Sequence, residues 1–302
     1  MEYNSNTNNA NSFSASNISN KVKDLISDPQ NLAYEFRKNK KNFVFWIAII
    51  VASLIIYLCL SSKEFSFFLV LSAIFQMSSF LIILMQVHNY QNSSGISLNS
   101  MYCYLIIMIT RLSSTLFYNG YLPSDTTGDW FYQFCELISL GCIGTIIFFI
   151  KRLYRETSDT ELDYVDYKYL FLPSLIVAFL VHTSLNNNIL TDIAWSCSMY
   201  LEAVAIYPQL YLFQTKGGQI ESYTSHYVSL QGLSRLMSLI FWYYTYEELN
   251  EEMEDSYSLF HSYTGFFLIA SQAIQLILMV DFYYYYIKSL YKGEAFTISN
   301  NI

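Results

Sequence analysis

The feature that most constrains the fold of this 302-residue chain is a series of long apolar runs. A helix that crosses a bilayer needs about 20 predominantly apolar residues, and it satisfies its backbone hydrogen bonds internally, as lipid requires. Such runs lie near residues 43–61, 65–87, 101–119, 130–150, 169–185, 192–213, 226–246 and 264–287. The sequence therefore predicts an all-α membrane protein with about eight spans.

The composition agrees with this fold class. Charged residues make up 13% of the chain and aromatic residues 18%, whereas about 25% of the residues in a soluble domain are charged. The apolar runs leave no room for a separate soluble core. The five cysteines lie inside apolar runs without a CxxC pair, so we expect neither a disulfide framework nor a metal site.

The positions of lysine and arginine predict the orientation. Basic residues precede the first span, flank the loop at 151–168, and follow the sixth and eighth spans at Lys216 and Lys288. With eight spans these positions share one side of the membrane, while acidic residues gather near 125–129 and 247–255 on the other. Because cytosolic loops carry the excess of Lys and Arg, both termini are predicted to be cytosolic.

The two ends of the chain are polar. Residues 1–42 begin with an Asn/Ser-rich stretch that predicts disorder and continue as a basic, partly amphipathic segment. Residues 291–302 form a short tail. Both segments are expected in the cytosol.

A weak internal repeat relates residues 85–111 to residues 208–235, at an offset of 123 to 124 residues. Each copy contains a helix end with a glutamine, a polar loop with a glycine, and a helix with one arginine in its apolar run. A repeat of this kind is typical of transporter folds built from two related bundles around a central cavity. Chance similarity between two membrane hairpins is the alternative.

Several charges lie inside the predicted spans or at their edges. They are Arg111, Glu136, Glu202, Arg235 and Asp281. A charge at membrane depth costs about 3 kcal/mol, so it usually faces a partner or a wet cavity. We interpret the group as a polar site in which two arginines retain capacity for an anionic ligand, since an Arg fork binds a carboxylate with two hydrogen bonds. Internal ion pairs that hold the bundle together are the alternative.

Catalytic signatures are missing from the sequence, which has no HExxH motif, Gly-rich phosphate loop or GxSxG motif. An enzyme is therefore not expected, and neither is a cofactor or a nucleic-acid partner. Asp192 and Trp195 share one face at the start of a helix. They are candidates for a ligand site, or else a first-turn acid and an interfacial anchor.

Three segments resemble the KDEL receptors, the ER lumen protein-retaining receptors. Residues 199–210 are similar to the family's YLESVAxLPQL segment, residues 223–227 to its xTSHY segment, and residues 281–286 to its DFFYxY segment. Residues 94–97 and 172–180 also match. The resemblance extends from about residue 65 to 293, nearly without gaps until the loop at 247–262.

The resemblance implies a seven-helix core at 65–290, in a SWEET-like, PQ-loop-type arrangement of two three-helix bundles. The span at 43–61 is then an extra N-terminal transmembrane helix. In the family, arginines in a lumen-facing cavity bind the carboxylates of a C-terminal Lys-Asp-Glu-Leu-type tail. The partners implied are such tails of lumenal proteins, together with membrane lipids and the coat proteins of retrograde vesicles.

Individual roles follow from matching positions. Arg111 matches the residue that grips the terminal carboxylate, and Asp192 and Trp195 match an acid and a Trp near the ligand's lysine. Glu202 and Arg235 match a pair linked to the conformational switch. In addition, Trp242 matches a cavity Trp and Asp281 an acid tied to receptor cycling.

This chain departs from the family pattern at several cavity positions. The family's first-helix Arg falls on Leu69, its pH-sensing His on Gln76, that histidine's Tyr partner on Ser234, and a third cavity Arg on Thr245. Because glutamine does not titrate, acid-triggered capture by the family's route is not expected at residue 76. The tail has Glu294 and Ala295 where relatives often carry lysine, which weakens the case for coat recruitment.

The reading that best fits these observations is a divergent receptor that retrieves lumenal proteins from Golgi to endoplasmic reticulum (ER) membranes. Two alternatives remain open. One is a receptor-related paralogue that has lost retrieval, which the missing His and Arg positions favour. The other is a SWEET-like carrier of small solutes, suggested by Pro208-Gln209 and the double bundle.

Overall fold

The computed structural model describes residues 40–60, 66–118, 121–122, 129–185, 188–251, 263–292 and 297–298. The chain divides into two units, residues 1–51 and 52–302. Helix α3 (Lys40–Leu60) covers the predicted first span. Residues 1–39 and most of the tail, for which we predicted cytosolic segments, lie outside the described residues.

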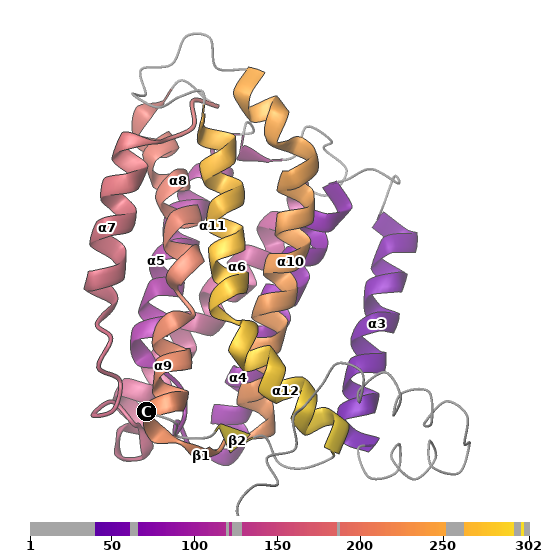
Figure 1. The fold of residues 1–302 in the computed structure, drawn as a ribbon, viewed down its shortest axis with the longest axis vertical. Helices are drawn as coiled ribbons and strands as arrows, with labels where there is room; N and C mark the ends of the chain where they lie inside the picture. Colours follow the sequence, from indigo (N-terminus) through magenta and orange to yellow (C-terminus); the bar gives the residue numbers. More distant parts are fainter. Residues whose placement is uncertain are drawn as a thin grey trace, which may run out of the picture. The chain divides into compact units, whose positions relative to one another are not determined.

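The second unit is helical almost throughout its described residues (Figure 1). Its helices are α4 (Ser66–Tyr90), α5 (Leu98–Thr115), α6 (Asp129–Phe148), α7 (Tyr167–Leu180), α8 (Ile189–Val204), α9 (Tyr207–Lys216), α10 (Ser222–Glu251), α11 (Thr264–Leu278) and α12 (Val280–Lys292). A π-helical turn, η3 (Phe149–Leu153), extends α6, and a 3₁₀ turn, η4 (Arg155–Thr157), follows it. Strands β1 (Gly218–Gln219) and β2 (Thr297–Ile298) pair antiparallel.

Six helices of this unit close a ring. Helix α4 packs against α6 and α10, α5 packs against α6 and α8, and α11 packs against α8 and α10. Helix α7 packs against α8 and α5, at the edge of the view in Figure 1. The repeat offset superposes α4 on α8 and α9, α5 on α10, and α6 on α11, and each contact of the ring then has its counterpart.

Two glutamines at matching positions of the repeat cross-link the halves. Gln209 accepts a hydrogen bond from the Ser97 backbone N–H (2.9 Å) and donates one to the Gly95 carbonyl (2.8 Å). Gln86 lies one repeat earlier, and it donates to Glu221 and accepts from the Thr224 hydroxyl (3.0 Å). Gln209 of the second half thus binds the start of α5 in the first half, and Gln86 of the first half binds the start of α10 in the second.

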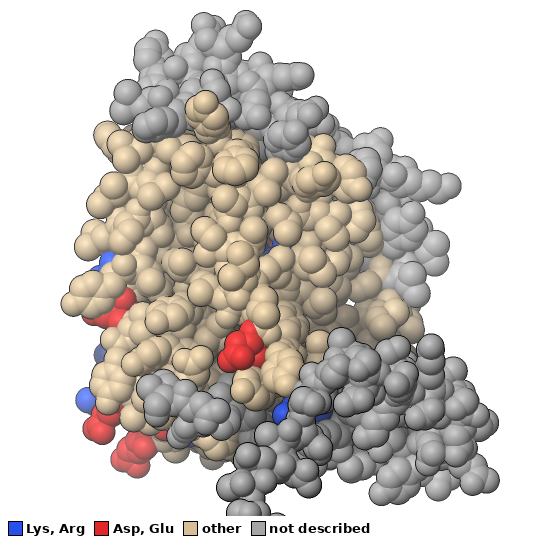
Figure 2. Space-filling model, in the orientation of Figure 1, with Lys and Arg blue, Asp and Glu red and all other residues tan. Residues whose placement is uncertain are grey.

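Three described segments are long and apolar enough to cross a membrane: Ser66–Tyr90, Asp129–Leu153 and Ile189–Lys216. The pair Thr264–Leu278 and Val280–Leu290, bent by 46°, makes a fourth if it crosses as one span. Val44–Ser53 and Tyr167–Leu180 are shorter apolar helices. Large exposed apolar side chains on α7, among them Ile176 and Phe179, and the mostly uncharged surface in Figure 2 suit a lipid environment.

The helix is interrupted within two of the predicted spans. Helix α8 ends at Val204, and α9 begins at Tyr207 with Pro208 in its first turn. The break follows from the proline, because its ring conflicts with the carbonyl four residues earlier and it lacks an N–H donor. The second break falls at Met279, between α11 and α12.

A polar network lies where the loop after α6 meets the starts and ends of other helices. Asp159 accepts hydrogen bonds from Gly95 N–H (2.6 Å), the Ser94 hydroxyl (2.9 Å) and Lys216 Nζ (2.6 Å). Burial alone favours its neutral form, but the hydrogen bonds from Lys216, Gly95 and Ser94 prevail and lower the pKa of Asp159. We call residues 94–95, 159 and 216 the loop-end network.

A second aspartate caps α5 beside this network. Asp163 accepts from the Ser97 hydroxyl (2.9 Å) and from Asn99 N–H (3.0 Å) at the N-terminus of the helix. Ser97 is itself the N-cap residue, whose side chain accepts from Ser100 N–H. Burial raises the pKa of Asp163, and the hydrogen bonds from Asn99 and Ser97 oppose that rise.

Candidate functional site

Five polar side chains from five helices meet inside the ring. Gln76 comes from α4, Arg111 from α5, Glu136 from α6, Glu202 from α8 and Arg235 from α10, and each is at most 3% exposed. We call these five residues the interior network. The repeat thus places its two arginines in one cluster, as the sequence pattern suggested.

Arg111 is held through all three of its guanidinium nitrogens. Its Nη1 contacts Glu202 Oε2 (2.7 Å), its Nη2 donates to Gln76 Oε1 (3.0 Å), and its Nε forms an ion pair with Glu136. The buried arginine therefore has an acceptor from each of three other helices. Such a cation is stable in the interior because its charge is paired with two carboxylates and its Nη1 and Nη2 groups donate hydrogen bonds.

Glu202 joins the two arginines. Its Oε2 contacts Arg111 and Arg235 Nη1 (2.7 Å each), and its Oε1 accepts from Gln76 Nε2 (2.6 Å). Arg235 also donates to Gln272 Oε1 on α11 (3.2 Å) and to the Ser234 hydroxyl (3.2 Å). One carboxylate of α8 thus ties α4, α5 and α10 together.

The charges of the interior network balance, since two arginines face two glutamates. We expected the arginines to outnumber nearby acids and to retain cation capacity. Among the described residues that surplus is absent, because Glu136, which lies toward one end of its predicted span, reaches Arg111. An anionic ligand therefore has to compete with internal carboxylates.

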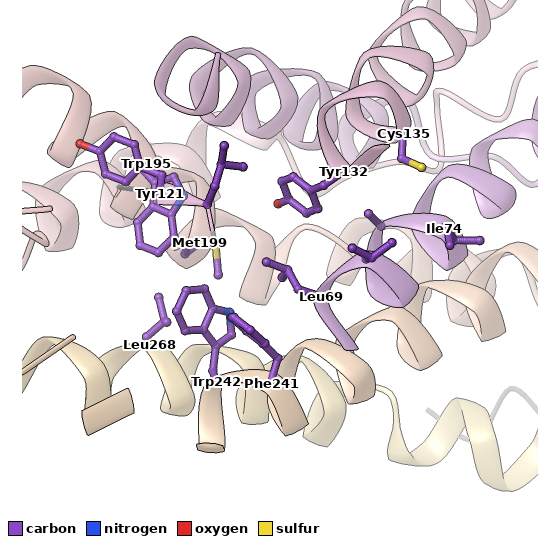
Figure 3. Packing of buried hydrophobic residues seen from close by; sticks show 13 residues of the cluster. Leu69, Ile74, Tyr121, Tyr132, Cys135, Trp195, Met199, Phe241, Trp242 and Leu268 are labelled. Carbon is purple, nitrogen blue, oxygen red and sulfur yellow. The ribbon is translucent and has the colours of Figure 1, made fainter. Parts of the chain in front are cut away.

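Aromatic side chains line the region next to this network. Tyr121 stacks on Trp195 (ring centroids 5.5 Å apart), and Trp195 meets Trp242 edge to face (5.7 Å). The Tyr121 hydroxyl donates to Asp192, which is 2% exposed at the start of α8. Figure 3 shows Trp195, Met199 and Trp242 grouped together, with Leu69 close by. Asp192 and Trp195 therefore lie together, as predicted, and Trp242 joins them from α10.

A small, partly open cavity lies between the aromatic side chains and the interior network. Its lining is Leu69, Ser72, Ala73, Gln76, Arg111, Tyr121, Tyr132, Trp195, Met199, Arg235, Ser238 and Trp242. Within the described part of the chain, Arg235 Nε and Trp242 Nε1 are buried donors without a hydrogen-bond partner. Two unused N–H donors on a cavity wall are suited to an acceptor such as a carboxylate.

Two of the four positions that depart from the family pattern, Leu69 and Gln76, line this cavity. Leu69 lines it and is buried in the apolar cluster of Figure 3. Ser234 donates to the Ser72 carbonyl (2.8 Å), and the Thr245 hydroxyl bonds within its own helix to Phe241 (3.0 Å). These three side chains add no charge, so the cations in the cavity lining are Arg111 and Arg235.

Asp281 lies apart from this cluster. It is an exposed residue in the first turn of α12, next to the break at Met279. No group of three or more His, Cys, Asp or Glu side chains able to hold a metal occurs within the described ranges. The chemistry that the cavity offers is therefore ion pairing, hydrogen bonding and aromatic contact.

Comparison with known proteins identifies the chain's relatives. A sequence profile of the family "ER lumen protein retaining receptor" matches residues 92–245. The chain belongs to this family. It is 29% identical over 234 residues to an ER lumen protein-retaining receptor of Entamoeba histolytica, covering 78% of this chain and 99% of that protein.

Vertebrate relatives give a similar picture. ER lumen protein-retaining receptor 2 of Danio rerio is 27% identical over 223 residues, covering 74% of this chain and 93% of the relative. Receptor 3 of Mus musculus is 27% identical over 231 residues, covering 76% and 97%. The resemblance identified from the sequence segments is thereby confirmed.

Sequence reasoning missed three features of the site. Gln76 was interpreted as a lost sensor, whereas it bridges Arg111 and Glu202. The Tyr121 contact to Asp192 and the Gln272 contact to Arg235 were not foreseen. A signal for Gln272 was available, because an amide in an apolar run needs a partner in lipid just as a charge does.

Proposed function

We propose that this chain is a receptor that binds C-terminal retention signals of the Lys-Asp-Glu-Leu type and returns lumenal proteins from the Golgi to the ER. One observation carries the proposal. This chain, a member of the receptor family, has a cavity whose lining includes Arg111, Arg235 and Tyr121, and the Tyr121 hydroxyl donates to Asp192. A peptide with a terminal carboxylate at one end and a lysine at the other fits this polarity.

The proposed roles divide along the cavity. Arg111 holds the terminal carboxylate, while Arg235 holds a side-chain carboxylate or remains with Glu202. Trp242 Nε1, a buried donor without a partner in the described residues, adds a hydrogen bond. Asp192 pairs with the ligand's lysine. Trp195 packs along the aliphatic part of that lysine, where the ammonium group is attracted to the indole ring.

We further propose that the core at 65–290 has the seven-helix, PQ-loop-type arrangement of two three-helix bundles, preceded by an extra transmembrane helix at 43–61. The ring of helices and the matched contacts of Gln86 and Gln209 support the two-bundle arrangement. The distribution of Lys and Arg supports cytosolic termini and a ligand side facing the lumen. The tail after residue 290 is the proposed contact for coat proteins, and Asp281, beside the α11–α12 break, is proposed to act in receptor cycling.

The proposal is tested by peptide binding to purified protein at pH 5.5 and 7.2. Arg111→Ala is expected to reduce affinity for a peptide ending in Lys-Asp-Glu-Leu at least tenfold, because a charge-assisted hydrogen bond is worth about 1.5–3 kcal/mol. Arg111→Lys keeps the charge but lacks the paired guanidinium donors, so its affinity is expected to lie between those of wild type and Arg111→Ala. Equal binding by wild type and Arg111→Ala would refute the site. Absence of binding by wild type at both pH values would refute the function.

The charge balance of the interior network favours one alternative. A receptor-related paralogue without retrieval needs no accessible arginine, and Arg111 is engaged by three acceptors. Expression in receptor-depleted cells separates the two functions. Rescue of a retention-tagged reporter supports retrieval, and secretion of the reporter supports the paralogue.

A further inference from the structure

Glu136 is distinguished from the other acid of the interior network by how few groups hold it. Glu202 contacts both arginines and the Gln76 amide. Glu136 forms an ion pair with one arginine, through Arg111 Nε, and its other close partner is the Tyr132 side chain. Because each guanidinium nitrogen of Arg111 already has an acceptor, a carboxylate that binds with both oxygens must displace one of them. Of the two glutamates, Glu136 pairs with one arginine and Glu202 with two, so Glu136 is the carboxylate more readily displaced.

The position of Glu136 also fits this role. Arg111 lines the cavity, whereas Glu136 does not, so the ion pair directs the Arg111 Nε edge to a carboxylate outside the lining. The titratable or charged groups around Glu136 are Tyr132 and Cys135 on its own helix, Arg111 from α5 and Glu202 from α8. Helix α4 contributes the uncharged amide of Gln76 to this network.

We propose that Glu136 is an internal competitor for the ligand carboxylate, and that its protonation in an acidic compartment releases Arg111 for the ligand. This inference rests on the proposed function and assigns acid dependence to a residue other than position 76. At neutral pH the Glu136 carboxylate holds Arg111. When Glu136 gains a proton, its charge is lost, and the terminal carboxylate of the peptide takes its place on Arg111. One proton is bound for each carboxylate exchanged, so the charge of the interior is conserved.

The experiment measures affinity for a Lys-Asp-Glu-Leu peptide at pH 5.5, 6.3 and 7.2. Wild type is expected to bind about tenfold or more tightly at pH 5.5 than at 7.2. Glu136→Gln, which cannot ionise, is expected to bind at pH 7.2 as tightly as wild type at pH 5.5, with no dependence on pH. Ser139→Ala is the matched control. Ser139 lies about one turn further along α6, and its hydroxyl donates to the Cys135 carbonyl of the same helix, so this variant is expected to keep the wild-type profile.

The outcomes separate the two proposals. If Glu136→Gln retains the pH dependence of wild type while Arg111→Ala lowers the affinity at least tenfold, the competitor role is overturned and the receptor function stands. If neither wild type nor Glu136→Gln binds at any pH, both are overturned. Should Glu136→Gln fail to elute as a folded protein, the wild-type profile decides, and equal affinities at pH 5.5 and 7.2 overturn the inference.

Discussion

The interior network and the loop-end network both join the two halves of the repeat, but they do so in different surroundings. The side chains of Arg111, Glu136, Glu202 and Arg235 are at most 4% exposed, whereas those of Lys216 and Asp159 are 35% and 21% exposed. Buried charges that lose a partner stay uncompensated, while water replaces a partner lost at the surface. The same kinds of contact should therefore differ several-fold in energy, and the predictions below compare them.

The largest effect is expected at Glu202. Glu202→Ala leaves two buried arginines without a shared acid, and breaking a buried pair from one side costs about 3–5 kcal/mol. We expect a large fall in the apparent melting temperature in detergent. Ser198→Ala, one turn earlier on α8 at a buried hydroxyl bonded to its own helix, serves as control. Equal melting temperatures for the two variants would contradict the account of the interior network.

The two glutamines of α4 provide the next comparison. Gln76→Leu removes acceptors and donors from Arg111 and Glu202, which costs about 1–3 kcal/mol because buried groups are left unsatisfied. Gln86→Leu removes contacts to Thr224 and to Glu221, an exposed residue, so about 1 kcal/mol is expected. Thermal unfolding of both variants checks the order, and a larger loss at Gln86 would reverse it.

A smaller effect is expected from the backbone of the loop-end network. Gly95 has φ of +79°, a conformation that costs a side-chain-bearing residue about 1 kcal/mol. Gly95→Ala should lower the melting temperature slightly, although an added Cβ meets no atom within 4 Å. Gly144→Ala in α6 also meets open space, without a positive φ, and should cause no loss. Equal melting temperatures for Gly95→Ala and Gly144→Ala would contradict a cost of placing a side chain at the positive φ of residue 95.

The smallest effect concerns pH. The folded-state pKa of Asp159 lies below its unfolded value of about 3.9, so its stabilisation is complete above that pH and is lost as pH falls through the folded pKa. Lys216→Ala should cost less than about 1 kcal/mol near pH 7. The difference from wild type should shrink below about pH 4. The pKa of Asp163 is raised instead. Asp163 is present in both wild type and Lys216→Ala, so its contribution cancels in the difference between them. A difference that widens in acid would contradict this assignment.

Much of the fold could be predicted because apolar runs report helices directly. The range 65–87 corresponds to α4, and 226–246 lies within α10. The interruption of the helix after Val204 was not predicted. Pro208 lies inside a continuous apolar run, and neither the length of the run nor its hydrophobic pattern shows where one helix ends and the next begins. The repeat predicted that Arg111 and Arg235 would be equivalent, and both bind one oxygen of Glu202.

The pairing within the site could be predicted less well. A charge in a span indicates that a partner exists, but which helix supplies it depends on packing. Glu136 was recognised as an in-span acid, yet its contact with Arg111 requires α5 and α6 to be neighbours at that depth. Gln76 carries no charge, so its bridging role gave no electrostatic signal in the sequence.

The most direct test of the central claim uses one protein and two peptides. The peptides share a Lys-Asp-Glu-Leu end, one with a free C-terminal carboxylate and the other with a C-terminal amide. If the cavity captures a terminal carboxylate through Arg111, wild type should bind the amide at least tenfold more weakly at pH 5.5, since a charge-assisted hydrogen bond of about 1.5 kcal/mol or more is lost. Equal affinity for the two peptides would contradict the claim.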